Sequence, residues 1–190
     1  MKNGANKYEN EKSLLKGCIQ GKREAQQQLY NLFSSKMFGV CLRYAKDHHN
    51  AEDLLQDGFV KVFKNISKFR GEGSFEGWIR RIFVNTAIEH YRKGNHLYPV
   101  LDSQMPEVHH VDNKALENLA VSDLLDMVNK LSPGYRTVFN LYVIEGFSHK
   151  EIAEMLKVTE GTSKSQLARA RYILQEMIYK YQDAQYEAII

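Results

Sequence analysis

The sequence predicts an all-α protein made of two small helical domains joined by a flexible linker, the C-terminal one a four-helix unit with a helix-turn-helix. Apolar residues recur at three- and four-residue spacings through most of the 190 residues, as they do in amphipathic helices. No segment shows the strict alternation of a half-buried strand. The helical periodicity fails between Gly94 and about Lys114, where two prolines interrupt it. We therefore predict an N-terminal domain over residues 1–94, a linker over 95–114 and a C-terminal domain over 115–190.

Composition indicates a folded soluble protein, since 26% of the residues are charged and 43% are hydrophobic. The net charge of +3 is only mildly basic, so any contact with nucleic acid must come from a local patch. No apolar run approaches the roughly 20 residues of a membrane span, and the polar start lacks the apolar core of a signal peptide. We expect a cytoplasmic protein without membrane insertion.

The cysteine and histidine spacings favour neither a metal nor a redox site. Cys18 and Cys41 are the two cysteines, and their apolar helical surroundings predict buried structural thiols. The His48-His49 and His109-His110 pairs are adjacent, so on a helix they would point apart. No Ser/His/Asp order, carboxylate pair or P-loop indicates catalysis. We expect no catalytic residue, no metal and no cofactor.

The first helical segment runs from Glu11 to Ala45 and is broken at Gly21. Its apolar stripes predict these core residues: Leu14, Leu15, Cys18, Ile19, Leu29, Leu32, Phe33, Met37, Val40, Cys41 and Tyr44. After a polar break at 47–50, a second helix is expected from Ala51, with its buried side formed by Leu54, Leu55, Phe59, Val62, Phe63 and Ile66. Its first two turns carry Glu52, Asp53, Gln56 and Asp57 on the other side. The helix macrodipole alone could account for these acidic residues.

A loop with two glycines, Gly71 and Gly73, precedes the next helix. The core side of that helix is predicted to hold Phe75, Trp78, Ile79 and Ile82, with Arg80, Arg81, Asn85, Arg92 and Lys93 off it. Aromatic residues, an asparagine and clustered arginines around such a loop suit single-stranded nucleic acid, whose bases stack on rings. Trp78 is assigned to the core, whereas Phe69 fits a core role and a stacking role equally well.

The C-terminal domain begins where periodicity resumes, at Ala115. Its first helix is predicted to place these residues in the core: Leu116, Leu119, Val121, Leu124, Leu125, Val128 and Leu131. Ser132 and Pro133 suit an N-cap and a first helical position, and the helix that they open should end at Gly146.

The stretch from Ser148 to Arg171 predicts the helix-turn-helix. Ser148 and Glu151 have the spacing of a capping box, and a second helix should follow a short turn at Lys157-Val158, with Thr159 as its cap. The apolar stripe of that helix consists of Ser163, Leu167, Ala170 and Leu174. At about 100° per residue, the opposite face consists of Gly161, Lys164, Ser165, Ala168, Arg169 and Tyr172.

That face is small, polar and basic, as a helix in the DNA major groove requires. The alternative is that Lys164 and Arg169 are merely solvated charges on the outside of the domain. The capping box, the short turn and the register of the apolar stripe together favour DNA binding.

Two stretches carry a family resemblance: NAEDLLQDGFVKVFKNISKFRGEGSFEGWIRRIFVNTAIEHYR and LSPGYRTVFNLYVIEGFSHKEIAEMLKVTEGTSKSQLARARYIL. The first resembles the promoter-melting domain of bacterial RNA polymerase sigma factors of the extracytoplasmic-function (ECF) group, and the second resembles that group's C-terminal domain. Both occur in the family's order and with its linker length, over roughly residues 11–178. The whole is similar to the members common in Bacteroidetes.

The resemblance implies a sigma factor that binds core RNA polymerase and directs promoter recognition, DNA melting and transcription initiation. It implies three sets of contact residues. The minus-thirty-five element would be read by Glu160, Lys164, Ser165, Ala168 and Arg169. The melted non-template strand of the minus-ten element would be held by Asn65, Phe69, Arg80, Arg81 and Asn85. Core polymerase would be contacted by Asp53, Gln56 and Asp57. The implied partners are core polymerase, promoter DNA in duplex and melted form, and an anti-sigma factor.

Two positions depart from the family pattern, and one rival function stays open. Lys157 stands where the turn usually has glycine, so the turn should be slightly strained or differently shaped. Ser163 occupies a core-facing position that is usually β-branched and apolar. The rival is a stand-alone helix-turn-helix regulator that binds duplex operators as a dimer. It would leave the region from Phe69 to Asn85 without a role.

Overall fold

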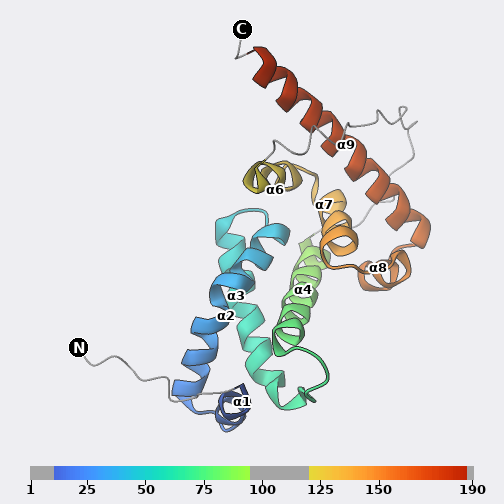
Figure 1. Ribbon diagram of the computed structural model, residues 1–190. Helices are drawn as coiled ribbons and strands as arrows, with labels where there is room; N and C mark the ends of the chain where they lie inside the picture. The colour runs from blue at the N-terminus through green and yellow to red at the C-terminus, as the bar shows by residue number, and fades with distance from the viewer. Residues whose placement is uncertain (1–10, 95–119, 188–190) are drawn as a thin grey trace. The chain divides into compact units, whose positions relative to one another are not determined.

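The computed structural model describes residues 11–94 and 120–187 (Figure 1). All regular structure within these ranges is helical, which confirms the predicted all-α fold. The chain divides into two compact units, residues 1–90 and 91–190, and each unit is considered by itself. The predicted linker at 95–114, the helical start at 115–119 and the His109-His110 pair lie outside the described residues. The exact domain bounds therefore stay a prediction.

The N-terminal part of the chain is a succession of helices, coloured blue to green in Figure 1. They are α1 (Glu11–Ile19), α2 (Arg23–Tyr44), α3 (His48–Asn65), the short 3-10 helix η1 (Ile66–Lys68) and α4 (Phe75–Gly94). Gly21 takes a positive φ of 70° between α1 and α2, as expected of the residue that breaks this segment.

The core of the N-terminal unit is aromatic where α3 meets α4. Phe59 and Phe83 pack edge to face, with ring centroids 5.3 Å apart. Gly58 is buried beside them, and a Cβ built on it would overlap the ring of Phe83. Ile79 is also fully buried, so the predicted core face of α4 is confirmed there, while Trp78 and Ile82 are only partly buried.

Three details of the predicted elements are wrong. Helix α3 begins at His48, inside the predicted polar break, because the carboxylate of Asp47 caps it by accepting a hydrogen bond from the Asn50 amide at 2.8 Å. Glu52 therefore lies beyond the first helical turn, where the macrodipole has little effect. Ile19 and Leu32 are each 53% exposed instead of buried, since each lies at the solvent edge of its stripe.

The C-terminal unit contains the helices coloured yellow to red in Figure 1. They are α6 (Val121–Asn129), α7 (Pro133–Phe139), the π-helical segment η2 (Asn140–Ile144), α8 (His149–Leu156) and α9 (Glu160–Glu187). Ser132 and Pro133 open α7 as predicted, although the Ser132 side chain makes no capping bond. Gly146 ends the segment with a φ of 77°. Val121, predicted to be buried, is 74% exposed at the start of α6.

Among the residues that the structure describes, no helix combines the length and the apolar character needed to cross a membrane.

Candidate nucleic-acid interface

A complete capping box sets the start of α8. The Ser148 backbone amide donates to the Glu151 carboxylate at 2.8 Å, and the Glu151 amide donates to the Ser148 hydroxyl at 3.3 Å. Two amides that would otherwise lack partners at the helix start are thereby satisfied. The helix start predicted from the Ser148–Glu151 spacing is confirmed.

The turn between α8 and α9 passes through a left-handed residue. Lys157 has φ 57° and ψ 48°, and it is the one non-glycine residue with a positive φ among the described residues. The turn therefore keeps the left-handed conformation that glycine usually supplies, with lysine in its place. Thr159 then caps α9, because its side-chain oxygen accepts a hydrogen bond from the Thr162 amide at 3.0 Å.

The inner face of α9 packs in the predicted register. Ser163 and Ala170 are fully buried, and Leu167 is nearly so. Leu174 is partly buried. On α8, Ile152 and Leu156 are buried. Because this inner stripe determines which residues of α9 face away from α8, it also defines the outer face.

The five residues predicted to read duplex DNA lie together in the first three turns of α9. Glu160 and Lys164 are exposed, and their charged groups are 4.0 Å apart. Ser165, Ala168 and Arg169 are partly exposed. The guanidinium of Arg169 lies over the ring of Tyr172, 5.2 Å from its centroid. This face offers a cation, a hydroxyl and a guanidinium on one rigid helix, as groove recognition requires.

Sequence reasoning missed His149, which contacts the inner face of α9. Its Nδ1 atom lies 2.9 Å from the Ser163 hydroxyl, and its ring stacks on Tyr142 with centroids 4.5 Å apart. The available signal was Ser163 itself, since a buried hydroxyl needs a hydrogen-bond partner.

In the N-terminal unit, the glycine-rich loop is bracketed by an aromatic cluster. Phe69 is partly buried, and its ring centroid lies 5.0 Å from that of Phe75 and 5.6 Å from that of Trp78. Gly71 and Gly73 both have positive φ, and the Ser74 hydroxyl accepts a hydrogen bond from the Gly77 amide at 2.9 Å, which caps α4. Phe69 is therefore packed against two aromatic residues of α4 while it stays partly exposed.

The other residues predicted to hold the melted strand are not all equivalent. Asn85 and Arg81 are exposed one turn apart on α4, and the Asn85 side chain makes no hydrogen bond within the described residues. Arg80 is partly buried. Asn65 instead donates its side-chain amide to the Lys61 carbonyl at 2.9 Å, near the end of α3. Asn65 is thus partly buried and bonded within α3, whereas Asn85 is exposed, and the contact of each with the melted strand stays a prediction.

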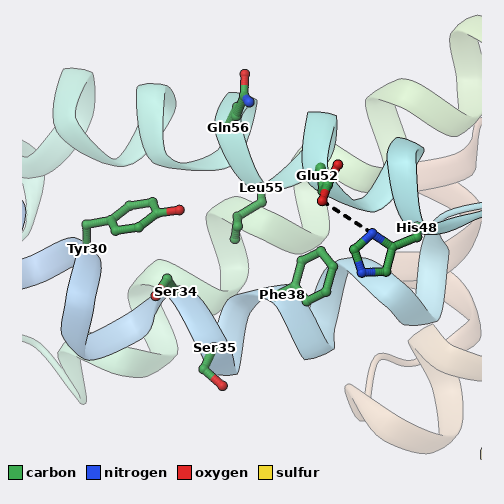
Figure 2. Close-up of a pocket in the computed structure, with 8 residues that line it drawn as sticks. All are labelled: Tyr30, Ser34, Ser35, Phe38, His48, Glu52, Leu55 and Gln56. Atoms are coloured by element: carbon green, nitrogen blue, oxygen red, sulfur yellow. Dashed lines mark ion pairs between the residues drawn. The ribbon is translucent and has the colours of Figure 1, made fainter.

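The predicted polymerase-binding residues lie on α3, and two of them have a histidine side chain next to their carboxylate. The carboxylate of Asp57 is 2.7 Å from His90 Nε2, and that of Asp53 is 4.0 Å from His49 Nε2. Gln56 is exposed beside an open groove of about 600 Å³ between α2 and α3. Figure 2 shows Leu55 and Phe38 lying between the two helices, and the His48–Glu52 ion pair, 3.3 Å long, near them. The acidic residues therefore lie beside a groove of mixed polarity, in which Leu55 and Phe38 are accompanied by serine, histidine and glutamate side chains.

The part of the chain that the structure describes contains neither a group of metal ligands nor an exposed thiol. Within residues 11–94 and 120–187, no three His, Cys, Asp or Glu side chains are grouped as metal ligands. Both cysteines are buried, as predicted, and burial raises the pKa of Cys18 to about 11 and that of Cys41 to about 12. Their thiols therefore stay protonated and unreactive near neutral pH.

Comparison with known proteins identifies both halves. Residues 29–96 match the model for Sigma-70 region 2, and residues 122–174 match that for Sigma-70 region 4. The chain is 28% identical to the ECF RNA polymerase sigma-E factor of Haemophilus influenzae, with 88% of this chain and 95% of that protein covered. It is also 28% identical to the ECF RNA polymerase sigma factor SigW of Bacillus subtilis, covering 88% and 96% of the two chains.

Among solved structures, the chain is similar to the sigma factor RpoE of Bartonella quintana, crystallised with the anti-sigma factor NepR. The TM-score is 0.49 at 24% identity, over 81% of this chain and 96% of the other. The two region matches and the full-length relatives define the class: the chain belongs to the sigma-70 family, as a member of its ECF type. It functions as a sigma factor.

Proposed function

We propose that this sigma factor divides promoter recognition between its two units, through the residues predicted from the sequence. On α9, Glu160, Lys164, Ser165, Ala168 and Arg169 would read the minus-thirty-five element in the major groove. The observation that carries this proposal is the outer face of α9, where these side chains lie together on a helix whose register is held by its buried stripe.

In the N-terminal unit, a flipped base of the minus-ten non-template strand would stack on Phe69 and hydrogen-bond to Asn85, with Arg80 and Arg81 near the backbone. The partial exposure of Phe69 and the exposure of the Asn85 side chain support this role. Asn65 would contact the same strand through its side-chain oxygen, because its side-chain nitrogen donates to the Lys61 carbonyl.

The acidic face of α3, with Asp53, Gln56 and Asp57, would dock on core RNA polymerase. Tethering to polymerase explains why a net charge of only +3 suffices, since linking raises the effective concentration of each weak DNA contact. We further infer a cytoplasmic, non-enzymatic protein without metal or cofactor, held inactive by an anti-sigma factor. The likeness to Bacteroidetes members stays a prediction.

The direct test is run-off transcription with core polymerase from the organism that carries the gene, on its own promoters. The expected result is promoter-specific transcript only when the chain is added. Failure of the chain to bind core polymerase would overturn the proposal. The rival function makes the opposite prediction in a gel shift, since a stand-alone regulator would bind duplex DNA tightly and specifically without polymerase.

A further inference from the structure

A buried hydrogen bond joins the two helices of the helix-turn-helix. The side chain of Ser163 on α9 has no exposed surface, and its Oγ atom lies 2.9 Å from Nδ1 of His149 on α8. A hydroxyl buried without a partner costs free energy, so the His149 contact is what makes serine tolerable at this core position. The bond is also directional, unlike the apolar contact that it replaces.

The imidazole of His149 is in turn held in place by its neighbours. Its ring stacks on Tyr142 of η2, with centroids 4.5 Å apart and planes inclined by 24°. The guanidinium of Arg171 lies over the same tyrosine, 5.8 Å from its centroid. Ser163 and Arg171 both belong to α9. This helix is therefore held to α8 through Ser163 and to η2 through Arg171.

The surroundings of His149 disfavour the charged form of its ring. Burial lowers its pKa most, the cations Lys164 and Arg171 lower it further, and Glu160 opposes them. A neutral imidazole can accept or donate at Nδ1 according to its tautomer, and therefore suits a hydroxyl that does both.

The bonded serine directly precedes the outer face of α9. Lys164 and Ser165 follow Ser163 in the chain, and one residue corresponds to about 100° around the helix. A small rotation of α9 about its axis would therefore displace every side chain proposed to reach a base edge.

We propose that His149 is a positioning residue, which sets the orientation of α9 for promoter reading through its hydrogen bond to Ser163. The inference rests on the proposed function of the α9 face. His149 itself need not touch DNA, because it acts through the serine.

The test uses the full chain with core polymerase and a pool of promoter duplexes randomised across the upstream element, with transcripts sequenced. His149→Phe keeps a ring against Tyr142 but loses the nitrogen, and Ser163→Ala loses the hydroxyl. At the upstream position with the strongest base preference, the measured quantity is the ratio of transcript from the best base to transcript from the second-best base. Each single variant should lower this ratio by about fivefold. His149→Phe combined with Ser163→Val replaces the bond by apolar contact and should restore the preference to within about twofold.

Ser132→Ala is the matched control, because Ser132 is exposed and its side chain makes no capping bond, so it should leave the preference unchanged. A uniform loss of transcript with unchanged base preference in both single variants would overturn the inference, since that is what simple destabilisation produces. Unchanged transcript and preference would overturn it as well. Absence of transcript with the wild-type chain would instead overturn the proposed function, and this inference with it.

If the single variants fail to fold, nitrogen NMR of the wild-type chain and of Ser163→Thr decides the matter. Threonine keeps the hydroxyl, so in both chains the Nδ1 shift of His149 should report a hydrogen bond at neutral pH. An Nδ1 atom without a hydrogen bond in the wild-type chain would overturn the inference.

Discussion

At the scale of single residues, the charge of His149 couples the stability of the C-terminal unit to pH. Burial, followed by Lys164 and Arg171, lowers the pKa of this histidine in the folded state. In the unfolded chain the pKa returns to about 6.5, so the unfolded state takes up a proton first as the pH falls. The contribution of His149 to the free energy of unfolding should therefore be fully present above about pH 6.5 and should decrease as the pH falls below it.

We expect acidification from pH 7.5 to 5.5 to destabilise the C-terminal unit more in the wild-type chain than in His149→Phe. The carboxylates are common to both chains, so the difference between the two pH profiles isolates the histidine. Hydrogen exchange of the α8 and α9 amides measures it. Parallel profiles would show that the His149 environment does not disfavour its charged form.

Lys157 is a residue-scale departure of another kind, because its backbone is left-handed. Lys157→Gly should stabilise the C-terminal unit by about 0.5–1 kcal/mol, since glycine adopts this conformation without steric cost. Lys130→Gly is the matched control: Lys130 also ends a helix, but its φ is −77°. There glycine should be neutral or destabilising by up to about 1 kcal/mol. Equal effects at both positions, by hydrogen exchange, would contradict the argument.

At the scale of helices, the contact between α3 and α4 depends on the absence of a side chain at Gly58. Gly58→Ala should destabilise the N-terminal unit by about 1–3 kcal/mol, because the added Cβ would overlap the ring of Phe83, which is itself buried. The fluorescence of Trp78, the single tryptophan of the chain, follows the unfolding of this unit in denaturant.

The control for this substitution is Gly39→Ala on α2, where a new Cβ would meet no atom within 4 Å. Alanine should stabilise the unit there by up to about 1 kcal/mol, through helix propensity alone. Opposite signs for the two variants would demonstrate close α3–α4 packing, whereas a shared sign would argue against it.

At the scale of the whole molecule, the two proposed DNA contacts should fail at different steps of initiation. Arg169→Ala should weaken promoter binding by about 1–3 kcal/mol and flatten the preference at the position that it reads. Asn85→Ala should leave upstream binding intact and impair open-complex formation. Footprinting of closed complexes and permanganate reactivity of melted thymines measure the two steps. If either variant impaired both steps equally, its effect would be on folding.

Much of the fold and of the candidate site was predictable because the signals are local. The capping box of Ser148 and Glu151, the Thr159 cap and the stripe containing Leu167 each involve residues a few positions apart, and each is confirmed. Gly21 and Gly146 end their helices through their own backbone conformations. The outer face of α9 could therefore be derived before the structure, as the surface opposite a correctly placed stripe.

Only the tertiary structure decided which side chains that are distant in sequence contact each other. The His149–Ser163 bond spans 14 positions and the His90–Asp57 pair spans 33, and periodicity carries no information about such pairings. Leu32 and Val121 are likewise exposed, although the periodicity of the sequence predicts both to be buried. Caps and stripes follow from the geometry of one helix, but the partner of a buried hydroxyl or a surface carboxylate depends on how helices pack. The sequence by itself therefore determined which residues share the outer face of α9, and the packing decided that His149 contacts the buried side of the same helix.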